Sequence, residues 1–373
     1  MRACVIGGSV SGLHSALFLL KSGVDVTIVE RKRKIGENII CAGGVASYMI
    51  RKVKIDIPNE FVATKVNRVR FYSPSMKYSE MDIGKEYGLI LWREKWEEWI
   101  GNEVGSIGGK ICLGVRDPTG FIKDCDLVVG ADGIAGITRR LVGCKPLPRG
   151  DVHIAVQAVC RVNLPDDAIS LFLGKRVAPE GYAWAFPIGG RMFRVGLGVP
   201  LTHSKFLHDL FSNLINDINA SYLEKPKAKV IPTAHPEESL VYDFMGKPLV
   251  LVGDAGLHTD PATGGGIMQA VLAAKCLSKA VSSGDIKVYD RIWRKELYGR
   301  NSKRYTLKKI LCELEDDEFE VIVGELQKMK PVNGSIGLTL MKLIAKVAVK
   351  HPSMIIKHKI IRKLIGFGEV AMF

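Results

Sequence analysis

The order of apolar and polar residues at the start of the chain predicts a strand, a helix and a second strand in close succession. Residues 3–6 form an apolar run, residues 12–20 have a small and apolar helical pattern, and residues 24–29 form a second apolar run that ends at Glu30. A glycine-rich turn, Val5-Ile6-Gly7-Gly8-Ser9-Val10-Ser11-Gly12, joins the first run to the helix. The pattern therefore predicts a βαβ unit with a tight first turn.

Two later segments repeat the combination of an apolar strand with an acid in the turn that follows. Residues 125–133 read Cys-Asp-Leu-Val-Val-Gly-Ala-Asp-Gly, and residues 248–255 read Pro-Leu-Val-Leu-Val-Gly-Asp-Ala before a helix at 267–281. Further strand patterns occupy residues 66–72, 154–162 and 192–199, and residues 290–373 read as helical. The mixture predicts an α/β fold that also carries a strand-rich part.

Length and composition are those of a globular protein. The chain has 373 residues, of which 47% are hydrophobic, enough for about two domains and an extension. It contains no run of the roughly 18 apolar residues that span a bilayer. The N-terminus enters a strand with no signal-peptide pattern, so we expect a cytoplasmic protein.

Cysteine usage and net charge limit the chemistry further. The eight cysteines are scattered singly, with no CxxC pair, so we expect neither a metal site nor a dense disulfide framework. The formal net charge of +14 implies acidic partners. That charge fits nucleic acid, anionic lipid or phosphorylated substrates equally well.

The first turn has the chemistry of dinucleotide binding. Its backbone N–H groups and the positive end of the following helix can hold a pyrophosphate, while Glu30 can accept hydrogen bonds from a ribose diol. Ser9 stands where the middle glycine of GxGxxG is expected, and it is small enough for a close backbone approach.

The three turns together resemble those of a flavin-dependent group that includes aromatic hydroxylases, halogenases and geranylgeranyl reductases. In that group GxGxxG, GADG and GDA motifs each touch FAD. The resemblance implies that Glu30 meets the adenosine ribose, Asp254 the ribityl or pyrophosphate region, and residues 264–267 the isoalloxazine. The implied FAD contacts are Gly7, Ser9, Ser11, Gly12, Glu30, Arg31, Cys41, Gly43, Gly44, Arg93, Val115, Asp132, Gly253, Asp254, Pro261, Gly265, Gly266 and Ile267.

Two of these positions also have simpler interpretations. Arg93 matches the arginine that opens a helix near the flavin in this group, but it could be a solvated arginine at a helix start. Asp132 could be a turn former, as acids beside glycine turns often are.

The substrate side is marked by residues 35–45, Ile-Gly-Glu-Asn-Ile-Ile-Cys-Ala-Gly-Gly-Val, and by residues 179–187, Pro-Glu-Gly-Tyr-Ala-Trp-Ala-Phe-Pro. In a strand, Tyr182, Trp184 and Phe186 share one face and form an apolar wall for a hydrocarbon or for core packing. Both segments look like the paired signatures of geranylgeranyl reductases, especially archaeal enzymes that saturate the isoprenoid chains of ether lipids. The resemblance implies an FAD-dependent oxidoreductase with an isoprenoid lipid substrate.

Saturating an unactivated alkene requires a hydride from reduced flavin and a proton from a donor across the double bond. Cys41 is our candidate donor, because a thiol near its reference pKa of about 8.5 is mostly protonated at neutral pH. Tyr182 is the alternative donor, and a buried Cys41 with no role stays open. No second dinucleotide turn follows Glu30, so both NADPH and reduced ferredoxin remain open as electron donors.

These placements predict a Rossmann-like FAD-binding domain, an inserted antiparallel-sheet substrate domain and a helical C-terminus. We assign residues 1–60, 88–150 and 245–290 to FAD binding, 61–87 and 151–244 to the substrate domain, and 291–373 to a basic helical region.

The end of the chain is strongly basic: residues 328–368 hold nine Lys or Arg and no Asp or Glu. Residues 336–349 and 355–365 place these cations among apolar residues at helical spacing, which suits peripheral contact with an anionic membrane. A helical pair packed on the body with a solvated basic face is the alternative. We expect no nucleic acid partner, because no nucleic-acid motif accompanies the charge.

Three other functions stay open. A flavin monooxygenase would share the FAD motifs and consume O2 with a small aromatic substrate. An electron-transfer flavoprotein would also need a membrane face, although the closely spaced cysteines of an iron–sulfur cluster are absent from the sequence. A non-enzymatic FAD-binding role is the third.

Overall fold

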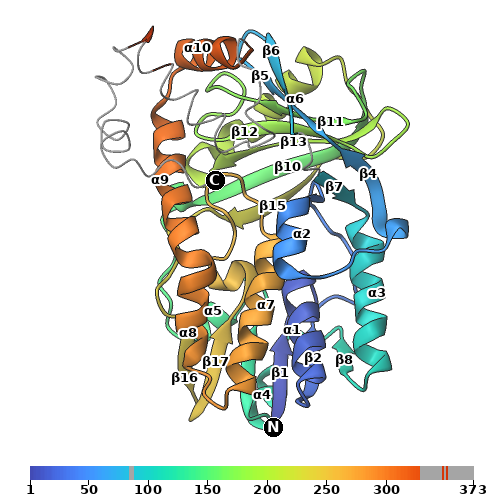
Figure 1. Cartoon of the computed structure of the whole chain (residues 1–373), viewed down its shortest axis with the longest axis vertical. Helices are drawn as coiled ribbons and strands as arrows, with labels where there is room; N and C mark the ends of the chain where they lie inside the picture. Colours follow the sequence, from blue (N-terminus) through green and yellow to red (C-terminus); the bar gives the residue numbers. More distant parts are fainter. Residues whose placement is uncertain (84–87, 328–346, 348–349, 352–373) are drawn as a thin grey trace.

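The computed structural model describes residues 1–83, 88–327, 347, 350 and 351. Figure 1 shows an elongated molecule with one sheet near the N-terminus and a second sheet at the other end, joined along one side by the C-terminal helices. Apart from residues 347, 350 and 351, the predicted basic membrane-contact region after 327 lies outside the described residues.

The first sheet is mostly parallel and contains the predicted βαβ unit. Its strand order is β16-β17-β9-β1-β2-β8. The strands are β1 (Arg2–Ile6), β2 (Asp25–Glu30), β8 (Lys110–Leu113), β9 (Leu127–Gly130), β16 (Val241–Phe244) and β17 (Lys247–Leu251). β1 pairs in parallel with β2 and β9, and only the edge strand β16 runs antiparallel among the pairs described here. The sheet therefore takes in residues from 241 onward, slightly before the expected boundary at 245.

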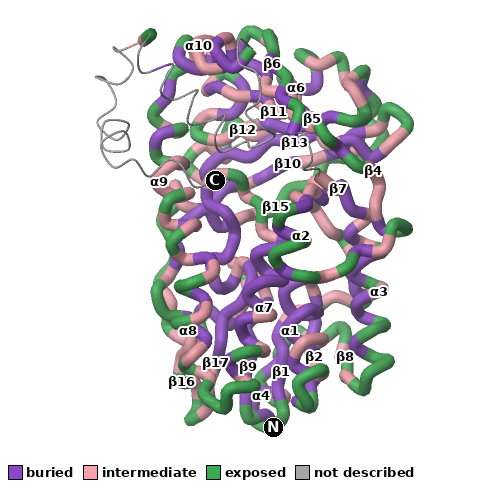
Figure 2. Tube along the Cα trace, viewed as in Figure 1, coloured by how far each residue is buried: buried purple, intermediate pink, exposed green. Residues whose placement is uncertain are grey.

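The three predicted turns meet at the carboxyl ends of β1, β9 and β17, which are neighbours in this sheet. That edge is where α/β sheets bind ligands. Helices α1 (Val10–Lys21) and α7 (Ile267–Ser282) pack against each other, and the apolar side chains of β1, β9 and β17 are buried in the same core. Figure 2 shows this buried interior along the three strands.

The second sheet is largely antiparallel, in the order β14-β10-β13-β12-β11-β5-β6, with β15 also paired to β10. Its strands are β5 (Arg68–Tyr72), β6 (Tyr78–Asp82), β10 (Val152–Arg161), β11 (Ala168–Phe172), β12 (Tyr182–Pro187), β13 (Met192–Pro200), β14 (Ser221–Tyr222) and β15 (Lys227–Pro232). The exception is the parallel pair β5 and β11. Helix α6 (Leu207–Asp217) covers one face with Phe211, Leu214 and Ile215.

A small sheet, in the order β3-β7-β4, lies between the larger two. It consists of β3 (Gly44–Ala46), β4 (Val62–Val66) and β7 (Gly88–Leu91). The apolar run predicted as one strand at 66–72 is divided here, because Asn67 leaves β4 and accepts a hydrogen bond from the Ile83 N–H at 2.9 Å before β5 begins. The chain thus changes sheets at Asn67.

The remaining helices flank the sheets and extend along the C-terminal side. They are α2 (Ser47–Val53), α3 (Arg93–Ser106), α4 (Thr119–Lys123), α5 (Thr138–Leu141), α8 (Val288–Trp293), α9 (Gly299–Glu313) and α10 (Asp316–Gln327). A π-helical turn, η5 (Arg294–Tyr298), joins α8 to α9 without a break. Among the described residues, no helix combines the length and apolar character that a bilayer span requires.

Candidate functional site

A cavity of about 1250 Å³ opens between the first and second sheets. All but one of the predicted site residues line it, and the exception is Gly12. The predicted residues in its wall are Gly7, Ser9, Ser11, Glu30, Arg31, Cys41, Gly43, Gly44, Arg93, Val115, Asp132, Tyr182, Trp184, Phe186, Gly253, Asp254, Pro261, Gly265, Gly266 and Ile267. Segments separated by more than 250 residues thus meet around one space.

The first turn of the chain lines the cavity with Gly7, Ser9, Val10 and Ser11. The Gly7 N–H donates to the Val29 carbonyl at 2.9 Å, which holds the turn beside β2. Gly12 lies behind this turn, where a Cβ atom would collide with the Gly7 carbonyl. Only glycine permits this close packing of α1 on the turn, which leaves the N-terminal end of α1 facing the cavity.

Glu30 is buried at the end of β2 and supports the same turn. Its Oε2 accepts a hydrogen bond from the Gly8 N–H at 2.5 Å, and its Oε1 accepts one from the Lys32 N–H at 2.9 Å. Each carboxylate oxygen has a second acceptor site, which a ribose hydroxyl could use. Val115 lies alongside, with its N–H donating to the Glu30 carbonyl at 3.0 Å.

Arg93 begins α3 as predicted, and it is buried rather than solvated. Its Nη2 forms an ion pair with Glu97, and the Ser9 hydroxyl donates to Glu97 Oε2 at 3.2 Å. The serine in the glycine motif therefore fastens the turn to α3. The buried Nε of Arg93 has no hydrogen-bond partner among the described residues, which leaves a donor for a bound molecule.

Cys41 is half-buried in the loop before β3. Burial alone would raise the pKa of its thiol, but the Arg93 guanidinium and the Gly43 N–H stabilise the thiolate, and the pKa lies below its ordinary value. The Gly43 N–H approaches Cys41 Sγ at 3.4 Å. Gly43 has φ of 82°, a conformation that favours glycine, so the Cys-x-Gly pattern reflects a backbone requirement.

The Cys41 loop is fixed from the second sheet by two polar residues that the sequence reasoning missed. Gln157 Nε2 donates to the Cys41 carbonyl at 3.2 Å, and Arg194 Nη1 donates to the Ala42 carbonyl at 3.1 Å. Gln157 lies on β10 and Arg194 on β13, and in each strand the immediate neighbours of the polar residue are apolar. An isolated polar residue in an apolar strand was the only available signal.

The acids of the second and third turns have local partners. Asp132 accepts hydrogen bonds from the Ile137 N–H at 2.6 Å and the Thr138 N–H at 3.0 Å, as a turn former at the start of α5 does. Burial raises the pKa of this carboxyl despite those bonds. Asp254 accepts a hydrogen bond from the Thr259 hydroxyl at 2.6 Å and keeps further acceptor sites toward the cavity.

The aromatic segment at 182–187 is strand β12, and its three rings line the same cavity. The Tyr182 and Trp184 rings lie 5.7 Å apart, and Trp184 Nε1 donates to Gln157 Oε1 at 3.3 Å. The Tyr182 hydroxyl donates to the Thr263 carbonyl in the third turn. Phe186 packs beside Gly44, where a Cβ atom would collide with the ring. The aromatic wall therefore faces the nucleotide turns.

The wall of the cavity also includes residues that no motif indicated. Lys308, Leu311 and Cys312 come from α9, and Phe319 comes from α10. The buried Lys308 ammonium contacts Asp151 and Thr233, and Thr233 also contacts His153. Burial lowers the pKa of His153 to about 4, so this imidazole is neutral near pH 7.

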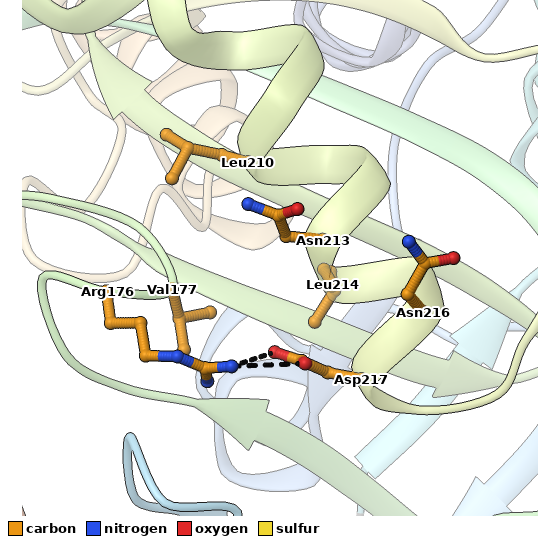
Figure 3. Close-up of a pocket in the computed structure, with 7 residues that line it drawn as sticks. All are labelled: Arg176, Val177, Leu210, Asn213, Leu214, Asn216 and Asp217. Carbon is orange, nitrogen blue, oxygen red and sulfur yellow. Dashed lines mark hydrogen bonds and ion pairs between the residues drawn. The ribbon is translucent and has the colours of Figure 1, made fainter.

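A second, smaller cavity of about 250 Å³ lies between α6 and the loop after β11 (Figure 3). Arg176 and Asp217 form an ion pair in its wall. Arg176 Nη2 lies 3.0 Å from Asp217 Oδ2 and 3.1 Å from Asp217 Oδ1. Its other lining residues are Val177, Leu210, Asn213, Leu214 and Asn216. None of the predicted site residues lies there.

Two family models match parts of the chain. Residues 151–235 match the geranylgeranyl reductase catalytic domain, and residues 2–68 match the pyridine nucleotide-disulphide oxidoreductase family. The first match covers most of the second sheet and its aromatic strand. The second covers the βαβ unit and the Cys41 loop.

Similarity to individual proteins extends over nearly the whole chain. The digeranylgeranylglycerophospholipid reductase of Methanocella arvoryzae is 26% identical over 386 residues, covering 94% of this chain and 96% of that protein. A geranylgeranyl bacteriochlorophyll reductase-like structure from Thermoplasma acidophilum matches with a TM-score of 0.82 at 22% identity, covering 96% of this chain and 98% of that one.

A more distant fold match is HpxO from Klebsiella pneumoniae, whose structure was solved with FAD and uric acid. It has a TM-score of 0.62 at 17% identity, covering 88% of this chain and 93% of that one. The predicted α/β fold, with its Rossmann-like sheet and antiparallel sheet, is confirmed. The predicted resemblance of this chain to geranylgeranyl reductases is confirmed as well.

Proposed function

We propose that this protein is an FAD-dependent oxidoreductase that saturates carbon–carbon double bonds in the geranylgeranyl chains of lipids or lipid precursors. The observation that carries the proposal is the single cavity in which three nucleotide-type turns face the aromatic wall of β12. Similarity to digeranylgeranylglycerophospholipid reductases over nearly the full chain supports this substrate class.

The residues in the cavity fit FAD. The first turn and the N-terminal end of α1 line the cavity where N–H groups would face a pyrophosphate, and Glu30 offers acceptors to a ribose. The buried Nε of Arg93, which has no hydrogen-bond partner within the part of the chain that the structure describes, offers a further donor. The Gly264 to Ile267 segment, at the start of α7, would lie beside the ring system. We accordingly propose residues 1–60, 88–150 and 245–290 as the FAD-binding part, 61–87 and 151–244 as the substrate-binding part, and 291–373 as the C-terminal region.

Bound reduced FAD would supply a hydride to one alkene carbon. The chain's own contribution is to hold the double bond in place and to exclude water, since an isolated alkene has little charge to bind. Tyr182, Trp184 and Phe186 provide an apolar surface for the isoprenoid chain in the wall of the cavity.

We propose Cys41 as the donor that protonates the second alkene carbon. Its thiol lines the cavity, and although burial alone would raise the pKa of the thiol, the Arg93 guanidinium holds it below its ordinary value. Tyr182 is a weaker candidate, because burial and then Asp260 raise the pKa of its phenol. Its hydroxyl also already donates to Thr263.

The test is an anaerobic half-reaction. The purified protein is loaded with FAD, reduced with dithionite and mixed with a geranylgeranyl lipid, while flavin absorbance and product mass are followed. We expect flavin reoxidation coupled to a gain of two hydrogen atoms per double bond. The matched control is the same lipid with saturated chains, which should leave the flavin reduced.

The proposal is wrong if the flavin is reoxidised only when air is admitted. That result would favour a monooxygenase or an electron-transfer flavoprotein. HpxO, at 17% identity to this chain, shows a shared fold and favours neither alternative.

A further inference from the structure

Helix α9 reaches the loop of the third nucleotide turn, although no motif singled this helix out. Asn301 and Arg304 both contact that loop, and Lys308 and Cys312 follow at the spacing of one helical face. Arg304 Nε lies 3.3 Å from Asp260 Oδ2, and the two side chains are only 16% and 3% exposed. Neither is among the residues that line the cavity.

Asp260 gives the turn between 260 and 266 its shape. Its Oδ1 accepts hydrogen bonds from the Ala262 N–H at 3.0 Å and the Thr263 N–H at 3.2 Å. Its backbone carbonyl accepts one from the Gly264 N–H at 2.8 Å, and its N–H donates to the Gly265 carbonyl at 2.9 Å. Residues 261–267 then form one side of the cavity.

The same turn carries the contact to the aromatic wall, because the Thr263 carbonyl accepts the hydrogen bond of the Tyr182 hydroxyl. A second tie comes from Asn301, whose Nδ2 donates to the His258 carbonyl at 3.0 Å. An unbroken set of contacts thus runs from Arg304 through Asp260 and the turn to Tyr182. Removing one partner of a buried ion pair leaves the other charge uncompensated, so this set should respond strongly to a change at Arg304.

We propose that Arg304 is a positioning residue that acts through Asp260. Its ion pair with Asp260 holds the 260–266 turn in the shape that receives the flavin ring. This loop also positions the Tyr182 hydroxyl through the Thr263 carbonyl. The role toward flavin rests on the proposed function, whereas the role in shaping the turn does not. The two parts therefore need separate measurements.

The first measurement is hydrogen exchange in the protein without FAD. In Arg304→Gln we expect the amides of Ala262, Thr263 and Gly264 to exchange at least tenfold faster than in the wild type. Amides of β13 should stay within twofold. Arg304→Lys keeps the positive charge, so exchange rates of the same amides should return to within threefold of the wild-type rates.

The matched control is Arg294→Gln in η5, on the same continuous helical run. Arg294 is about half exposed and contacts Glu238 at the surface, so exchange in the 260–266 turn should not change. Asp260→Asn tests the other partner of the ion pair. In the double variant Arg304→Gln/Asp260→Asn, amides of the 260–266 turn should exchange no faster than in the more severe single variant.

The second measurement uses the FAD-loaded protein. We expect the visible flavin bands to shift in Arg304→Gln and Asp260→Asn and to return toward wild type in Arg304→Lys. In turnover, kcat should fall about tenfold while KM stays within twofold, because Arg304 does not touch the lipid.

Unchanged exchange in the turn and an unchanged flavin spectrum, with only a lower melting temperature, would show that Arg304 merely supports the fold and would overturn the proposal. If Arg304→Gln does not fold, Asp260→Asn replaces it as the test. Amide exchange in the 260–266 turn of Asp260→Asn that equals the wild-type exchange would overturn the proposal. If the wild-type protein binds no FAD, the proposed function is wrong. Hydrogen exchange in the protein without FAD would still test whether Arg304 shapes the 260–266 turn.

Discussion

Cys41 and Arg93 show how a single neighbour changes what a residue can do. A thiol in an apolar pocket is ordinarily harder to ionise, yet the Arg93 guanidinium reverses that tendency. The position of Cys41 near the turns was predicted from the resemblance of its Cys-x-Gly segment to that of geranylgeranyl reductases. The sequence did not reveal that Ser9 contacts Arg93 and Glu97, because those contacts join segments more than 80 residues apart.

Replacing Cys41 with serine should remove the proton donor. We expect Cys41→Ser to slow single-turnover alkene reduction about 100-fold, within the range for a lost general acid, with FAD affinity nearly unchanged. Tyr182→Phe is the matched control and should slow the reaction less than threefold. Equal rates in Cys41→Ser and the wild type would assign the proton to another group.

The pH profile tests the same role with a definite sign. The donor must be protonated, so the wild-type rate should fall as pH rises through the Cys41 pKa. Because Arg93 lowers that pKa, the fall should begin below the pH at which an ordinary thiol ionises. Cys41→Ser should lack this alkaline limb, and a limb that persists in Cys41→Ser would contradict the assignment.

At the scale of elements, the strand and helix patterns near the turns were predictable because each element carries its own signal. β1, α1, β2 and α7 start and end within about two residues of the predicted positions. The division of residues 66–72 was not predictable, because Asn67 is set by a bond to Ile83. The contribution of α9 and α10 to the cavity could not be predicted from the sequence either, because helical periodicity does not indicate which part of the protein a helix face packs against.

Packing of α1 on the first turn can be tested at Gly12. We expect Gly12→Ala to lower the free energy of unfolding by about 2–4 kcal/mol, because its Cβ would collide with the Gly7 carbonyl. Urea unfolding measures this directly. Gly105→Ala in α3 is the matched control: its Cβ would meet no atom within 4 Å, so stability should hold or rise slightly. Equal stability of the two variants would refute the packing argument.

For the whole molecule, buried histidines should make stability depend on pH. Burial lowers the pKa of His14 and His153 to about 4 and that of His258 to about 3. Their folded-state pKa values lie below the unfolded value of about 6.5, so the unfolded chain binds more protons in between. The stabilisation is complete above about pH 6.5 and is lost as pH falls toward 4.

Denaturant unfolding between pH 7.5 and 4.5 should therefore show a declining free energy, with each histidine contributing up to about 1.4 kcal/mol per pH unit. His153→Asn should reduce the slope of the free energy of unfolding against pH. His208→Ala, which removes an exposed imidazole, should leave that slope unchanged. A slope that is the same in His153→Asn and the wild type would contradict the assignment.

We also propose that the basic C-terminal segment contacts anionic membranes, a role supported by its sequence pattern alone. A chain ending at residue 327 should sediment with anionic vesicles at least tenfold less than the full chain, with zwitterionic vesicles as the control. Equal sedimentation of the two chains would refute this role and favour the packed helical pair.

The strand order of the first sheet also dictates when the protein can mature on the ribosome. β9 lies between β1 and β17, but β17 is made more than 100 residues after β9. At ordinary elongation rates, β9 waits on the order of ten seconds for its partner. During that time a parallel apolar edge is open to unwanted pairing. Nascent chains stalled before residue 240 should consequently need chaperone protection and be unable to acquire FAD.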